Sequence, residues 1–187
     1  MTISDGAGEE ERSIREVRLR RRVITTGRSL PLLGLSLLVL AGLVVFAVAD
    51  WESAVTPPGM VLKWRYALCC RTFEALGLLL GAGAALVIYG GVLLSACSER
   101  GRATALLGLR VAMVYWPVTM LGFVAMALTR RTVAEGQVPP LLLAAVAALG
   151  MAAGVGVLWL QARWLCRPEV WETCNRSEID DSPADGR

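Results

Sequence analysis

Five cysteines are the residues of this sequence best suited to covalent chemistry. Cys69 and Cys70 are adjacent, and we do not expect them to form a disulfide with each other. Cys97 and Cys166 each follow a long apolar run, where a thiol at the membrane surface can carry an acyl chain, so both are candidate S-palmitoylation sites. The alternative is that they serve only as small apolar residues at helix ends.

The sequence contains no histidine, which is the commonest general base and the commonest ligand of transition metals. It shows no paired carboxylates within an apolar run and no phosphate-binding loop. Cys166 and Cys174 lack the close-spaced partners of a zinc site. We therefore predict no catalytic residue, no cofactor site and no metal site.

Arginines dominate the first 29 residues, with seven between positions 12 and 28. The interleaved apolar residues allow a short helix on the membrane surface, and the alternative is a solvated basic flank that only sets orientation. The expected partner is the anionic inner leaflet, and we expect no nucleic-acid partner. The predicted lipid-surface contacts are Arg18, Arg20, Arg21 and Arg22.

Three further charged residues lie near or within apolar runs, where charge is costly and often functional. Arg71 and Glu74 are one helical turn apart and can pair locally. Arg110 lies one turn inside the start of the third apolar run, so its side chain can reach the membrane surface. On this interpretation no charge lies near a bilayer midplane, which disfavours a pump or an ion-coupled transporter.

The elements that position these side chains are apolar helices. Of 187 residues, 55% are hydrophobic, and the mean hydropathy of +0.55 is typical of a membrane protein. A helix needs about 20 apolar residues to cross about 30 Å of hydrocarbon. We predict four membrane-spanning helices, at about 30–49, 75–97, 106–128 and 141–161.

The predicted fold is all-α, with these helices in a bundle. The membrane domain covers 30–164, between a basic tail at 1–29 and an acidic tail at 165–187 that we expect to be disordered beyond about Cys174. Pro31 is expected in the first turn of its span, where a missing N–H is harmless. Pro117, inside the third span, is expected to kink that helix.

Two pairs of glycines have the spacing that places both residues on one helix face. Such a face lets another backbone approach closely in a membrane, either within this chain or from a partner's helix. We predict helix-packing roles for Gly77 and Gly81 in the second span, and for Gly150 and Gly154 in the fourth.

The distribution of basic residues predicts the orientation of the chain. With both termini in the cytoplasm, 14 of the 19 basic residues lie on the cytoplasmic side, as expected for cytoplasmic loops. The protein is therefore expected to be an integral, multi-pass membrane protein, and both the plasma membrane and the endoplasmic reticulum remain open.

These observations favour a function that works through helix contacts. We expect a non-enzymatic assembly, trafficking or accessory subunit that binds another membrane protein or a second copy of itself. The alternative is a small channel or transporter acting as a homo-oligomer, which the prolines and glycines inside the spans permit.

Overall fold

The computed structural model describes residues 5–55, 64–133 and 140–180, and within these ranges the chain is helical with no strand. Four of its helices are long and apolar enough to cross a membrane, which confirms the expected all-α class. The five helices are α1 (Asp5–Val55), α2 (Trp64–Ser95), α3 (Glu99–Val133), α4 (Pro140–Leu165) and α5 (Pro168–Asp180).

Helix α1 is longer than the sequence suggested, because the basic segment and the first span form one continuous helix of 51 residues. Pro31 consequently lies in the middle of α1 and not in its first turn, so the expectation of a harmless position is wrong. Its ring removes the N–H that would bond to the carbonyl of Gly27, four residues earlier.

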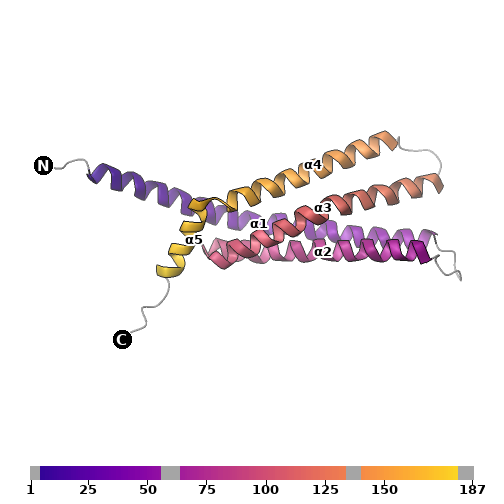
Figure 1. The fold of residues 1–187 in the computed structure, drawn as a ribbon, viewed down its shortest axis with the longest axis horizontal. Helices are drawn as coiled ribbons and strands as arrows, with labels where there is room; N and C mark the ends of the chain where they lie inside the picture. Colours follow the sequence, from indigo (N-terminus) through magenta and orange to yellow (C-terminus); the bar gives the residue numbers. More distant parts are fainter. Residues whose placement is uncertain (1–4, 56–63, 134–139, 181–187) are drawn as a thin grey trace, which may run out of the picture.

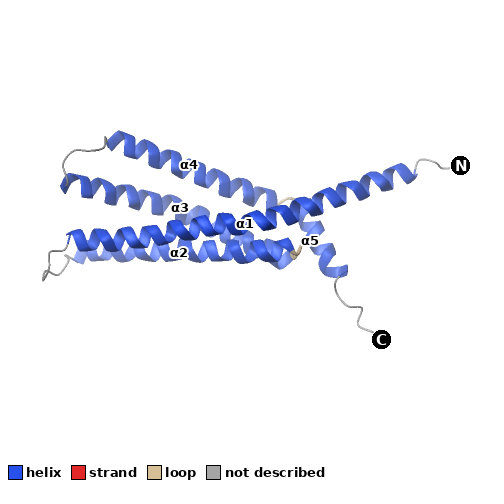
Figure 2. Cartoon of the chain, turned by 180° about the vertical axis from the view of Figure 1, so that it is seen from behind, coloured by secondary structure: helices blue, strands red, loops and turns tan. Residues whose placement is uncertain are grey.

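The long helices pack mainly against their neighbours in the sequence. Helix α2 runs beside α1 on one side and α3 on the other, and α4 packs on α3 (Figure 1). Among the described residues, α4 makes no extensive contact with α1 or α2. Viewed from behind, α1 and α2 remain together along the span while α4 diverges from them (Figure 2).

A tight turn joins α2 to α3 and sets their relative height. The Cys97 N–H donates to the Leu94 carbonyl at 2.9 Å, and the Ser98 N–H donates to the Leu93 carbonyl at 3.3 Å. This is a Schellman motif, in which the residue at the Cys97 position is usually glycine because φ is positive. Cys97 adopts φ of 56°, so a side chain occupies the left-handed region there.

The core lies mainly between α1, α2 and α3, most of its side chains are aliphatic, and it extends to buried residues of α4 and α5. Leu30, Leu80, Val87, Leu94 and Leu109 are almost completely inaccessible. Within the described residues, the one buried polar side chain is that of Thr119, whose hydroxyl donates to the Tyr115 carbonyl at 2.7 Å. That bond satisfies the hydroxyl locally, as threonine commonly does in membrane helices.

Helix α5 was not predicted from the sequence. It continues past Cys174, where we expected disorder, and ends at Asp180. It contacts α1, α3 and α4, burying Val170 and Cys174 completely. The Trp171 indole N–H donates to Glu99 Oε1 at 3.0 Å, which ties α5 to the start of α3.

Candidate functional site

The glycine pair of α2 packs against α1. A Cβ added to Gly77 would lie 2.9 Å from Val45 Cγ2, closer than side chains normally approach. A Cβ added to Gly81 would lie 3.7 Å from Ala41 Cβ, an ordinary van der Waals distance. The groove between these glycines is therefore filled by α1 of the same chain, and Gly77 is the tighter position.

The glycine pair of α4 holds a side chain where we had expected a backbone. The Trp116 indole of α3 lies over Gly154, and its N–H donates to the Gly150 carbonyl at 3.4 Å. A Cβ on Gly154 would lie 2.8 Å from Trp116 Cζ2, whereas a Cβ on Gly150 would meet nothing within 4 Å. Trp116 is therefore the contact that attaches the middle of α4 to α3.

Two adjacent glycines of α2, which do not have the four-residue spacing, also allow close backbone approach. A Cβ on Gly90 would lie 2.7 Å from Ala105 Cα of α3. A Cβ on the adjacent Gly91 would lie 2.8 Å from Leu30 Cβ of α1. Because successive helical residues point about 100° apart, one adjacent pair lets α2 be approached from both sides.

The same junction receives the carbonyl that Pro31 leaves without its helical donor. A Cβ on Gly91 would lie 3.0 Å from the Gly27 carbonyl oxygen and 2.7 Å from Pro31 Cδ. A Cβ on Gly27 would in turn lie 2.6 Å from the Ser95 nitrogen. The glycines of α1 and α2 thus place the proline-altered part of α1 directly against the backbone of α2.

The arginines predicted to contact lipid all lie in the first half of α1 and are exposed. They extend from the end of α1 that projects beyond the other long helices, toward the N-terminus in Figure 1. These arginines therefore belong to the same continuous helix as the first predicted span, and not to a separate surface helix. The residues are Arg18, Arg20, Arg21 and Arg22.

The two candidate acylation sites differ in access. Cys97 is buried and belongs to the main core cluster, whereas Cys166 is exposed just after α4. Acylation of Cys97 would require that residue to leave the core. Cys166 has the accessible position that the modification needs.

The three charged residues near apolar runs differ in their surroundings. Arg71 and Glu74 pair at 2.8 Å in the N-terminal third of α2, as their spacing suggested. Arg110 is exposed on α3, eleven residues after that helix begins at Glu99. Gly108 packs on Val87, which is at the middle of the predicted span 75–97.

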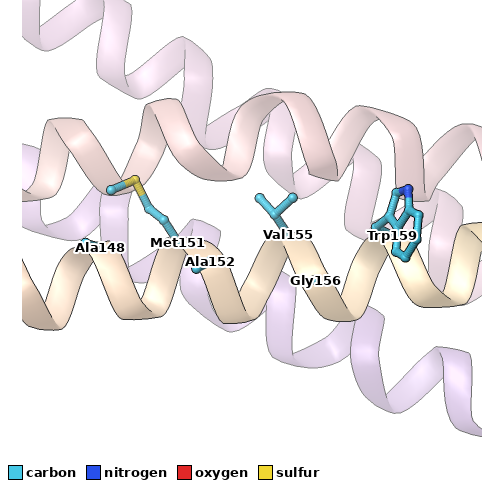
Figure 3. Close-up of a pocket in the computed structure, with 6 residues that line it drawn as sticks. All are labelled: Ala148, Met151, Ala152, Val155, Gly156 and Trp159. Atoms are coloured by element: carbon cyan, nitrogen blue, oxygen red, sulfur yellow. The ribbon is translucent and has the colours of Figure 1, made fainter.

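One side of α4 forms a shallow apolar groove with a volume of about 550 Å³. Met151, Val155 and Trp159 rise from α4 in the same direction along it (Figure 3). Gly156 contributes no side chain, and a Cβ there would meet nothing within 4 Å. The remaining lining residues are Ala148 and Ala152.

No protein-family model, curated protein or solved structure matches this chain. Among the described residues, no three side chains of the types that bind metals come together. Three features of the helix surfaces bear on the proposal that follows: the charge of Arg110, the groove of α4 and the arginines of α1.

Proposed function

We propose that this chain is a non-enzymatic, multi-pass membrane protein that acts through helix contacts as an assembly, trafficking or accessory subunit of a membrane complex. Its four long helices cross the membrane and both termini lie in the cytoplasm. Fourteen of its 19 basic residues would then lie on the cytoplasmic side.

The observation that carries this proposal is the uncovered surface of α4. In the most apolar 18-residue stretch of α4, only 11% is buried, compared with 39% in the corresponding stretches of α2 and α3. Five large apolar side chains of α4 are exposed: Val146, Leu149, Val157, Trp159 and Leu160. Gly156 lies beside them at the edge of the groove, where a small residue allows close approach of another helix. A helix that its own chain leaves this open is suited to contact a second protein.

Two accessory contacts belong to the same proposal. The arginines of α1 lie beside the headgroups of the anionic inner leaflet, at about 1 kcal/mol for each residue near the surface. Acylation of Cys166 would add an anchor at the cytoplasmic end of α4. Both contacts position the chain, while the groove selects the partner.

The test is purification of the tagged full chain from its native membranes in mild detergent. We expect a different membrane protein to co-purify in a fixed ratio. Gly156→Leu fills the groove without a steric clash, so it should preserve the melting temperature but reduce recovery of the partner about tenfold.

Gly42→Leu is the matched control, because Gly42 on α1 also has nothing within 4 Å of its Cβ position. It should preserve both the melting temperature and the partner. Recovery of the wild-type chain alone would refute the proposal. A pure homo-oligomer that conducts ions in a planar bilayer would instead support the channel alternative.

A further inference from the structure

Arg110 lies on the side of α3 that the rest of the chain leaves open. Its neighbours along that side are apolar and exposed: Leu107 is 55% accessible and Val114 is 63% accessible. Arg110 makes no hydrogen bond or ion pair with any residue that the structure describes. A guanidinium, which stays charged at any physiological pH, therefore lies among side chains suited to lipid.

The height of Arg110 follows from the contacts between α2 and α3. A Cβ on Gly108 would lie 2.7 Å from the Val87 nitrogen, and a Cβ on Gly83 would lie 2.9 Å from Val111 Cγ1. Arg110 is therefore level with the stretch 83–87 of α2. The predicted span 75–97 is centred on Leu86, so Arg110 lies at half-height.

Helix geometry gives the same result from the cytoplasmic side. Arg110 follows the partly buried Arg102 by eight residues, which at 1.5 Å each is about 12 Å along α3. Half of a hydrocarbon layer is about 15 Å. An arginine side chain on α3 points toward Glu99, but its three methylenes span only part of that distance.

No carboxylate of this chain can neutralise Arg110 at that depth. Between residues 30 and 165 every acidic residue lies outside the four predicted spans. A second copy inserted in the same orientation places its acids at those same depths, so it has no counter-ion to offer. These residues are Asp50, Glu52, Glu74, Glu99 and Glu135.

We infer that the Arg110 side of α3 binds a membrane-spanning helix of a different protein that carries an aspartate or glutamate near its middle. A carboxylate accepts two parallel hydrogen bonds from a guanidinium, and the pair removes an isolated charge from hydrocarbon. Leu107 and Val114 supply the apolar contacts on either side. This inference rests on the proposed accessory function and names the chemistry of its partner.

The test places p-benzoylphenylalanine at position 107 of the full chain and irradiates membranes of the native cells. The expected product joins the chain to a membrane protein with an acidic residue at mid-span. Arg110→Leu should lower recovery of that protein about tenfold in detergent. Arg100→Leu, which removes an exposed charge from the start of α3, should leave recovery unchanged.

Exchanging the two charges tests whether Arg110 pairs with the partner's acidic residue. Arg110→Asp should lose the partner, and replacing the partner's acidic residue by arginine should restore it. Arg110→Leu removes a charge from an apolar surface, so its melting temperature and elution volume should match those of the wild type, which separates loss of binding from loss of folding.

The failures of the two proposals are distinguishable. If a membrane protein co-purifies with the wild type and equally with Arg110→Leu, the accessory function stands and the inference about Arg110 is wrong. Cross-links only to a second copy or only to lipid also overturn the inference. If no other membrane protein co-purifies with the wild type, the proposed function fails as well.

Discussion

Gly90 and Gly91 show how two neighbouring residues can set the distances among three helices. Gly90 receives the backbone of α3 at Ala105, and Gly91 receives α1 at Leu30. In a membrane, packing between helices depends on such close approach because lipid is as apolar as the side chains. Small residues at this junction therefore hold α1, α2 and α3 together.

Gly90→Ala should destabilise the protein by about 1 to 3 kcal/mol, since the new methyl group meets backbone atoms of α3 that cannot move aside. Gly150→Ala is the control, because a Cβ there meets nothing within 4 Å. Unfolding in detergent micelles, followed by circular dichroism, compares the two. Equal losses of stability would contradict the assignment of the junction.

Cys97 offers a second test at the level of one residue. Its φ of 56° costs a non-glycine residue about 1 to 2 kcal/mol. Cys97→Gly should therefore be more stable than Cys97→Ala by about 1 kcal/mol, because both variants lose the sulfur and only glycine relieves the backbone. The same unfolding measurement decides this, and an alanine variant of equal or greater stability would show that the turn is unstrained.

At the level of single residues, the spacing of glycines in the sequence predicted only some of the helix contacts. Gly77 and Gly81 share a face and were found by their separation of four. Gly90 and Gly91 were missed because adjacent residues face different neighbours, so no single-face pattern marks them. The position of Arg110 beside residues 83–87 of α2 follows from packing between two helices, which neither apolar run reveals.

Among the elements, α4 is the helix least integrated into the molecule. Its attachments include the Trp116 indole over Gly154 and a 3.4 Å hydrogen bond from Arg102 Nη1 to the Leu165 carbonyl. The first fixes the middle of α4 and the second fixes its C-terminal end. Opening of α4 from α3 therefore depends on few side chains.

Trp116→Ala should cost about 3 kcal/mol, because it leaves a cavity at the contact between α3 and α4. Hydrogen exchange in micelles should increase in α4 more than in α1 and α2. Trp159→Ala is the control: this ring is 49% exposed and lies 5.1 Å from Arg163 Cζ, a cation–π contact of about 1 kcal/mol or less. Uniform exchange across all helices would contradict a local attachment.

Hydropathy predicted the existence of the long helices but not their ends. The span beginning at Leu30 was identified, yet α1 starts at Asp5 because arginine, glutamate and leucine are good helix formers outside the membrane as well. Helix α5 was missed because its composition is acidic, although Val170 and Cys174 are spaced to share one face.

Considered as a whole, the molecule has a well-packed part and an open part. Helices α1 to α3 meet through backbone contacts at glycine, with α5 tied to the beginning of α3. Helix α4 and the Arg110 side of α3 leave apolar surface and an uncompensated charge exposed. Those two surfaces are where we propose that the chain meets another protein.

Sequence patterning indicated an all-helical membrane protein because each span needs a long apolar run, which is a local property. The relative heights of the helices are not local. They follow from the tight turn at Cys97 and from which glycines meet which backbones, and the depth of Arg110 depends on both.

The most direct test of this account is mapping of the chain's topology in intact cells. Tags at the two termini, and single cysteines introduced at Thr56 and Gly136 in a cysteine-free background, are probed with impermeant reagents before and after permeabilisation. If both termini are cytoplasmic, both tags should react only after permeabilisation, and both introduced cysteines should react before it. An exposed tag at either terminus, or a protected cysteine at either position, would contradict four crossings with cytoplasmic ends.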